Sequence, residues 1–198
     1  MGTSGCGKTT ALKYLDAAYT QLYPTARHYV LDTKIDGGDF NLWPNTVMSD
    51  TCPAKPGSND RYQVWRVVKI IPEEIEKWLW MVRHDPPAVL EIDELYSLVY
   101  KRNTYSDEYN ILQKVGRGLP VGSITLTQEL SKIPSNAFKQ STHRLGFYID
   151  GRYDQLVRND MLKFKVEQPK DTFGVYYQHI NGRGEPDYFK DIQSFLGL

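Results

Sequence analysis

The first ten residues, MGTSGCGKTT, have the residue types and spacing of a phosphate-binding loop. Gly2, Gly7, Lys8 and Thr9 fit the pattern G-x-x-x-x-G-K-[ST]. In such a loop the glycines let successive backbone N–H groups surround an anion, the lysine reaches the β- and γ-phosphates, and the hydroxyl ligates Mg²⁺. The alternative is a glycine-rich turn that binds nothing. The pattern predicts a nucleotide site made of Gly2, Thr3, Ser4, Gly5, Cys6, Gly7, Lys8, Thr9 and Thr10.

Two acidic residues follow a short apolar stretch, AVLEID, further along the chain. A phosphate-bound magnesium needs a second acid that holds its waters, best placed at the carboxyl end of a neighbouring strand, so Asp93 is the predicted metal-site residue beside Thr9. Glu94 is placed to deprotonate an attacking water, which favours hydrolysis over transfer to another acceptor. The alternative is that both acids only favour the start of a following helix through its dipole. We interpret Glu91, inside the strand, as a paired structural acid.

Two further residues have types that suit a γ-phosphate. Gln128 ends the predicted strand SITLTQ, where its amide can contact the γ-phosphate or the attacking water. Arg117 lies between two glycines in VGRGLPVG, and a planar cation on a stiff turn suits an arginine finger for a neighbouring subunit. A polar strand cap and a solubilising surface charge are the respective alternatives.

Strands and helices alternate along the chain. Apolar runs bounded by glycine and proline predict strands, and apolar stripes at helical spacing predict helices. The alternation favours a parallel sheet with helices on both faces, in a single domain spanning residues 1–198. The expected helices cover 7–22, 72–84, 107–116, 130–140 and 151–164, with a helical continuation after Asp93 and Glu94. The expected strands cover 27–34, 61–68, 88–93, 123–128, 143–149 and 172–180, and 44–60 is a surface excursion.

Composition narrows the class of protein. The 24 basic and 24 acidic residues cancel, so any contact with nucleic acid must be local rather than the result of a global field. The two cysteines, Cys6 and Cys52, lack zinc-ligand spacing and fit a reducing compartment, which predicts a cytoplasmic location. No apolar run approaches the ~20 residues that span a bilayer, so no membrane segment is expected.

The ordered set GTSGCGKTT, LDTKIDGGDF, VLEIDEL and LQKVGRGLPVGSITLTQELSKIPSNAFKQSTHRLGF resembles the HerA–FtsK superfamily of ring-forming, ATP-driven DNA translocases. The last stretch is the most specific, with GR-x-x-x-G, a strand ending in T-Q, and an Arg before a strand. The resemblance implies an α/β P-loop NTPase of the additional-strand catalytic glutamate type, with a mainly parallel sheet, that uses ATP and Mg²⁺. An Asp-x-Lys at Asp32 and Lys34 also matches FtsK-like members. The implied roles are Lys8 and Thr9 on nucleotide and metal, Asp93 on magnesium, Glu94 as base, Gln128 as γ-phosphate sensor and Arg117 as the finger acting in trans.

The same resemblance implies double-stranded DNA and a homo-oligomeric ring as partners. In its small size and lack of extra domains the chain looks most similar to genome-packaging ATPases of viruses with internal membranes. This similarity implies a capsid vertex as a further partner. It also implies the host cytoplasm or the virion as the location. A conjugative or plasmid DNA-transfer ATPase, a small-molecule kinase and a nucleotide-binding assembly factor with little hydrolysis are the alternatives. Candidates for DNA contact, with a solvated face as the alternative, are Lys101, Arg102, Arg152 and Arg158.

The chain departs from the family at its start, where only Met1 precedes the loop and the usual strand is missing. In relatives that strand is central in the sheet, and we expect it beside the strand ending in Asp93. Its absence then leaves open backbone hydrogen bonds and a gap in the core. The expectation is therefore an upstream start, a fragment, or another segment in the empty position.

Overall fold

A computed structural model of the 198-residue chain describes residues 7–33, 45–101, 104–115, 118–128, 137, 140–147, 174–179 and 187–197. The chain divides into two compact units: a terminal unit, residues 1–16 with 127–198, and a central unit, residues 17–126. The predicted helix 151–164 and most of the predicted helix 130–140 lie outside the described residues. No helix among the described residues is both long enough and apolar enough to cross a membrane.

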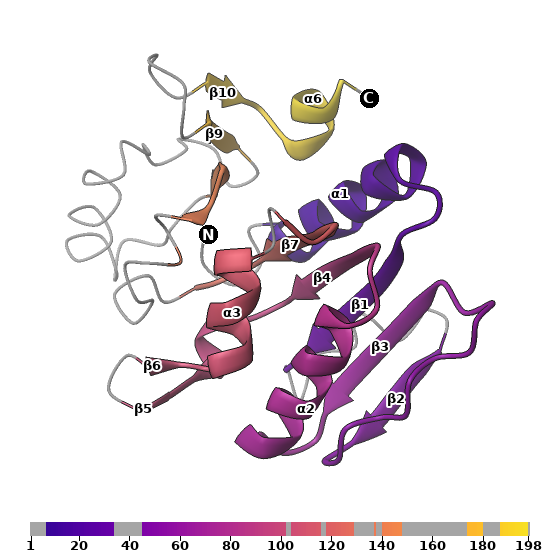
Figure 1. Ribbon diagram of the computed structural model, residues 1–198. Coiled ribbons are helices and arrows are strands. Elements are labelled where there is room, and N and C mark those ends of the chain that lie inside the picture. Colours follow the sequence, from indigo (N-terminus) through magenta and orange to yellow (C-terminus); the bar gives the residue numbers. More distant parts are fainter. Residues whose placement is uncertain are drawn as a thin grey trace. The chain divides into compact units, whose positions relative to one another are not determined.

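The central unit is built on a five-stranded, fully parallel sheet with the order β2-β3-β1-β4-β7 (Figure 1). This sheet and its flanking helices confirm the predicted α/β class. The strands are β1 (Arg27–Asp32), β2 (Thr46–Ser49), β3 (Tyr62–Val67), β4 (Ala88–Ile92) and β7 (Val121–Thr125).

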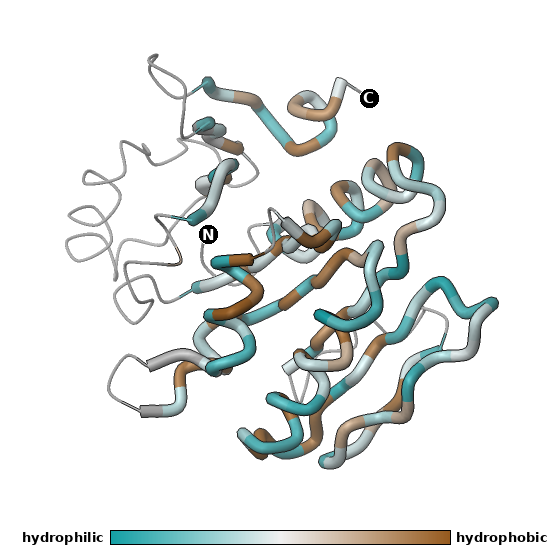
Figure 2. Tube along the Cα trace, in the orientation of Figure 1, coloured by the Kyte–Doolittle hydropathy of each residue, from teal (hydrophilic) through white to brown (hydrophobic). Residues whose placement is uncertain are grey.

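The three inner strands are buried almost throughout. Every residue of β4 is buried, as is every residue of β1 and β3 after the first. Burial along the whole strand is typical of parallel strands covered on both faces, and β4 stands out as hydrophobic in Figure 2. The stretches that predicted strands at 27–34, 61–68 and 88–93 therefore form the middle of the sheet.

One face of the sheet packs against α2 (Pro72–Arg83) and α3 (Asp107–Val115). The side chain of Trp78 in α2 is fully buried, its ring lies 5.9 Å from that of Trp65, and its indole N–H donates to Gln63 Oε1 at 3.2 Å. Pro72 starts α2, followed by two glutamates in the first turn, as the sequence predicted.

The start of α3 is held by α2. Glu76 accepts hydrogen bonds from the backbone N–H groups of Asp107 and Glu108, at 3.1 and 2.9 Å. Arg83 reaches the Glu108 carboxylate with two nitrogens, Nε at 2.8 Å and Nη2 at 3.2 Å. A carboxylate at a helix N-terminus satisfies otherwise unpaired donors, so these contacts both cap α3 and join it to α2.

The opposite face of the central sheet packs against the end of α1 (Lys8–Leu22). Thr20 Oγ1 lies 2.9 Å from the hydroxyl of Tyr62 in β3, and a Cβ at Gly122 in β7 would lie 3.8 Å from the ring of Tyr19. Helices therefore cover both faces, as predicted.

Several boundaries differ from the sequence-based expectations. The excursion 44–60 contains an unexpected edge strand, β2, which pairs in parallel with β3. A 3₁₀ helix, η2 (Leu95–Leu98), follows β4 where a longer helical continuation was expected, and leads into a hairpin of β5 (Val99–Lys101) and β6 (Thr104–Tyr105). Strand β7 ends at Thr125, three residues before the predicted end at Gln128.

The position beside the strand ending in Asp93 is filled, in agreement with one of the three expectations raised by the short N-terminus. β4 pairs with β1 on one side and with β7 on the other, so both of its edges are hydrogen-bonded. The segment that fills the position is β7, which comes later in the chain and pairs with β4 in the register Leu90↔Ser123.

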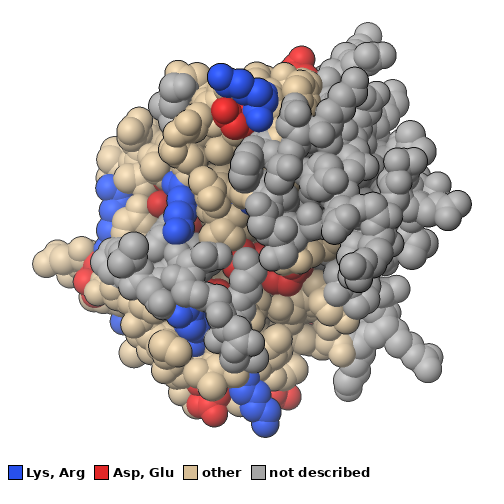
Figure 3. Space-filling view, turned by 180° about the vertical axis from the view of Figure 1, so that it is seen from behind, with Lys and Arg blue, Asp and Glu red and all other residues tan. Residues whose placement is uncertain are grey.

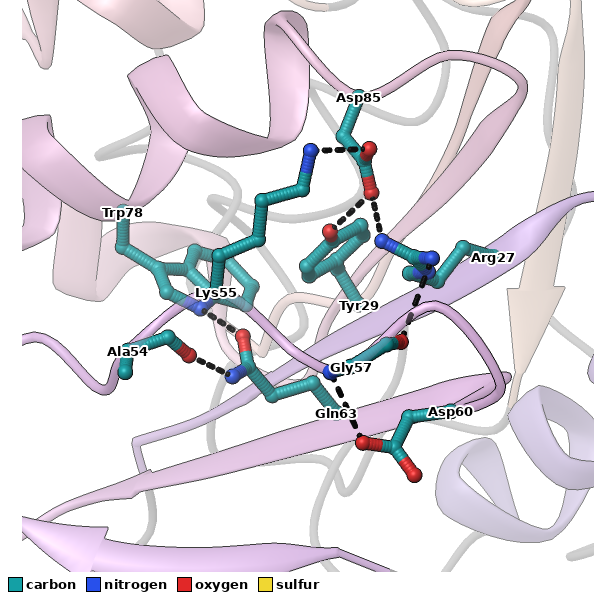
Figure 4. A network of polar contacts seen from close by, with 9 residues as sticks. All are labelled: Arg27, Tyr29, Ala54, Lys55, Gly57, Asp60, Gln63, Trp78 and Asp85. Atoms are coloured by element: carbon teal, nitrogen blue, oxygen red, sulfur yellow. Dashed lines mark hydrogen bonds and ion pairs between the residues drawn. The ribbon is translucent and has the colours of Figure 1, made fainter.

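A polar network closes the amino end of β1 and ties the 50–60 segment to the sheet (Figure 4). The Asp85 carboxylate pairs with Arg27, accepts from Tyr29 Oη at 2.5 Å, and pairs with Lys55 Nζ at 2.6 Å. Burial alone would raise the pKa of Asp85, but hydrogen bonds from Lys55 and Tyr29 and the charge of Arg27 outweigh it and lower that pKa. Gln63 extends the network by donating to the carbonyl of Ala54 at 2.6 Å.

The terminal unit contains an antiparallel sheet, β10-β9-β8, formed by β8 (His143–Phe147), β9 (Val175–His179) and β10 (Asp187–Phe189). A short helix, α6 (Ile192–Leu196), follows β10. The apolar cluster of this unit comprises Ala11, Phe147, Val175 and Ile192. The first half of α1 thus shares a core with the C-terminal part of the chain.

Candidate nucleotide site

Helix α1 begins directly after the predicted phosphate-binding loop. Gly7 has φ of +89°, a conformation that strains any residue with a Cβ, and its carbonyl accepts the first helical hydrogen bond from Ala11 N at 2.8 Å. Lys8 is the first helical residue and only 5% exposed, Thr9 is half-buried, and Thr10 is exposed. The predicted loop residues Gly2, Thr3, Ser4, Gly5 and Cys6 lie outside the described residues.

Asp93 follows β4, at the carboxyl end of an inner strand of the parallel sheet. Its backbone N–H donates to the carbonyl of Leu31 at 3.2 Å, so the ladder with β1 extends one step beyond β4, and its side chain is 1% exposed. This is the strand end at which ligands of open α/β sheets bind. The sequence placed Asp93 at such an end correctly.

Glu94 is half-buried and extended, with φ of −139°, and its Oε1 accepts a hydrogen bond from the backbone N–H of Tyr96 at 3.4 Å. It is therefore the N-cap of η2. This contact supports the alternative raised from the sequence, in which the acid favours the start of the next helix. The cap is a contact between Oε1 and a backbone N–H, so it does not conflict with a role as base.

The sequence missed the partner of Asp32. Arg66, in register with Asp32 on the neighbouring strand, approaches Asp32 Oδ2 with Nε and Nη2, each at 2.8 Å, and the two residues are 5% and 0% exposed. Close by in the chain, Thr33 Oγ1 lies 2.9 Å from the hydroxyl of Ser97. The only available signal was an arginine within the apolar run YQVWRV.

Glu91 is a paired structural acid, as predicted. Its Oε1 lies 3.1 Å from His28 Nδ1, and both side chains are fully buried. His28 Nε2 lies 3.3 Å from Thr20 Oγ1, and its ring centroid lies 4.9 Å from that of Tyr62. These contacts connect β1 to β4, β3 and α1.

Two predicted site residues remain, Gln128 and Arg117. Gln128 is exposed and follows β7 by three residues, while Arg117 lies outside the described residues. Lys8, Thr9 and Gln128 belong to the terminal unit, whereas Asp93 and Glu94 belong to the central unit.

No described side chain tests the DNA-contact candidates. Arg102, Arg152 and Arg158, and the side chain of Lys101, lie outside the described residues. On the face drawn in Figure 3, basic and acidic side chains of the described part are interspersed, without a continuous basic surface. This pattern agrees with the zero net charge of the chain.

The donor set fits Mg²⁺. Mg²⁺ prefers hard oxygen ligands and is usually held by one or two carboxylates together with substrate phosphates and waters. The Asp93 carboxylate and the Thr9 hydroxyl are ligands of this kind, and neither soft sulfur nor imidazole is part of the predicted set.

No protein-family model and no curated protein matches the chain. Solved structures do match. One is the genome-packaging NTPase B204 from Sulfolobus turreted icosahedral virus 2 in complex with ATP-gammaS: TM-score 0.69, 17% identity, 96% of this chain and 94% of that chain covered. The same protein with sulfate matches at TM-score 0.73 and 16% identity, over 96% and 93% of the two chains.

The DNA-packaging ATPase B204 from Sulfolobus Turreted Icosahedral Virus matches at TM-score 0.70 and 15% identity, over 96% of this chain and 94% of that chain. At such identities the likeness concerns the fold. The chain therefore has the α/β fold of these viral NTPases, with a mainly parallel sheet flanked by helices.

Proposed function

We propose that this chain is an ATPase that translocates double-stranded DNA and packages a viral genome into a capsid, acting as a homo-oligomeric ring. ATP is the substrate, and Mg²⁺ is held by Thr9 and Asp93. The observation that carries the proposal is the start of α1, where Gly7 at positive φ leads into a buried Lys8 at the first helical position. A helix N-terminus and a lysine both contribute positive charge there, and a phosphate is the ligand that such charge attracts.

The proposed reaction is hydrolysis of the β–γ phosphoanhydride bond. Glu94 accepts a proton from water, the water oxygen attacks the γ-phosphorus, and the bridging oxygen leaves on ADP, which yields ADP and inorganic phosphate. The bound magnesium neutralises charge on the phosphates. Gln128 contacts the γ-phosphate, and Arg117 from the neighbouring subunit stabilises the charge that develops in the transition state.

The fold supports the packaging role. The solved neighbours are named as genome-packaging NTPases and a DNA-packaging ATPase, and their chains are covered over 93–94% of their length. Several subunits that converge on one duplex need only a few polar or basic loop residues each, so zero net charge is compatible with a grip on the phosphate backbone.

The test is the ATP hydrolysis rate of the purified chain with and without linear double-stranded DNA. Turnover stimulated by DNA is the expected result. Turnover that requires a small-molecule phosphate acceptor would instead identify a kinase. Tight ATP binding without turnover would identify a nucleotide-binding assembly factor.

A further inference from the structure

Arg66, Asp32 and Asp93 come from three neighbouring strands at the carboxyl edge of the central sheet. Arg66 of β3 is in register with Asp32 of β1. On the other side of β1, Leu31 is in register with Ile92, and the Asp93 N–H donates to the carbonyl of Leu31. Residues in register on parallel strands point to the same face, about 5 Å apart. Extending the register Leu31↔Ile92 by one residue pairs Asp32 with Asp93, directly after β4.

All three residues are buried: Arg66 is 5% exposed, Asp32 0% and Asp93 1%. Two neighbouring carboxylates in such surroundings repel each other. The guanidinium of Arg66, with Nε and Nη2 each 2.8 Å from Asp32 Oδ2, places a positive charge against Asp32 and offsets this repulsion.

We propose that Asp32 is a positioning residue of the magnesium site and that Arg66 holds it in place. This inference rests on the proposed ATPase function. Asp32 would accept hydrogen bonds from waters that a bound Mg²⁺ keeps, beside Asp93, because Mg²⁺ sheds its waters reluctantly. Arg66 fixes the position of the Asp32 carboxylate through the charge-assisted contacts to Oδ2.

The same strand offers a matched control. β1 begins with Arg27, which pairs with Asp85, and ends with Asp32, which pairs with Arg66. Both are pairs of an arginine and an aspartate, but the Asp85 pair lies at the amino end of the strand, away from Asp93. If Asp32 has only a structural role, removing the charge of Asp32 or of Asp85 should change metal affinity to a similar extent. If Asp32 helps to bind the metal, only the change at Asp32 should lower metal affinity.

The experiment compares Asp32→Asn and Asp85→Asn with the wild type. Mn²⁺ replaces Mg²⁺, its binding to the protein–ATP complex is measured by electron paramagnetic resonance, and ATP affinity in EDTA is measured separately. Asp32→Asn should weaken Mn²⁺ binding about tenfold, the usual effect of losing a partner of a metal site, with ATP affinity in EDTA unchanged. Asp85→Asn should bind Mn²⁺ like the wild type.

Wild-type Mn²⁺ affinity in Asp32→Asn would overturn the inference and leave the ATPase proposal intact. Equal weakening in Asp32→Asn and Asp85→Asn would also overturn it, since the effect would then be structural. Failure of the wild type to bind ATP would overturn the proposed function together with the inference. If Asp32→Asn does not fold, the double variant Asp32→Asn with Arg66→Gln keeps a neutral polar pair, and the same tenfold loss is expected of it.

Discussion

His28 Nδ1 lies 3.1 Å from Glu91 Oε1, and this pair spans β1 and β4 with both side chains fully buried. A buried polar group that loses its partner keeps its desolvation cost without the compensating contact. The pair therefore holds the two inner strands together, and removal of either residue leaves the other with a buried polar group that lacks this contact.

Glu91→Ala should lower the free energy of unfolding by about 3 kcal/mol, because it leaves His28 without this carboxylate. Urea denaturation followed by circular dichroism measures the loss. Glu73→Ala, at an exposed position in the first turn of α2, is the control and should cost less than about 1 kcal/mol. Similar losses in both variants would contradict the structural role of Glu91.

Lys8→Ala should abolish ATP binding, because it removes the cation at the start of α1. Lys13→Ala is the matched control, since Lys13 lies on the same helix and is exposed. Titration of a fluorescent ATP analogue measures both affinities. Unchanged affinity in Lys8→Ala would refute the phosphate-binding loop itself.

Glu94→Gln should retain ATP binding and lose turnover at least about a hundredfold, the usual contribution of a general base. Phosphate release at saturating ATP measures turnover, and nucleotide titration measures binding. Glu73→Gln controls for the loss of one negative charge elsewhere. Turnover equal to that of the wild type would exclude Glu94 as the base and leave it as the cap of η2.

Arg117→Ala subunits mixed with Glu94→Gln subunits should recover part of the ATPase activity that each variant lacks alone. An arginine finger in trans makes one intact site at an interface between the two kinds of subunit. Hydrolysis measured over a range of mixing ratios gives the result. A lack of recovery at every ratio would place the arginine outside the neighbouring site.

Asp85 makes stability depend on pH at the acid end. Its pKa is lowered in the folded state, so its contribution is fully present above the unfolded value of about 4 and is lost as pH falls through the lower folded value. The difference in free energy of unfolding between the wild type and Asp85→Asn should therefore shrink below about pH 4. Urea denaturation at several pH values measures it; a difference constant with pH would contradict the assignment.

Local pattern predicted the inner strands and the helices α1, α2 and α3 well. The apolar run that became β4, and the Pro-Glu-Glu start that became α2, are signals carried by neighbouring residues. β2 gave no such signal, because Val47 and Met48 are exposed and its pairing depends on β3, which comes later in the chain. The position of β7 beside β4 is also set by long-range pairing, so the sequence could raise the possibility of another segment there but could not say which.

The candidate site divides in the same way. Two short motifs of consecutive residues identified Lys8 and Asp93. The structure places Lys8 at the start of α1 and Asp93 at the carboxyl end of β4. Arg66 forms its ion pair with a residue 34 positions away, and only the register of β1 and β3 brings the two together. A contact of this kind cannot be recognised before the strands are paired.

The carboxylate of Glu76 binds the first N–H groups of α3, and Arg83 grips Glu108 at the same end. These two attachments join α2 and α3, so the helices are expected to move together rather than independently. A force that acts on α3 therefore also acts on α2, and through the buried Trp78 of α2 it reaches β3 of the central sheet.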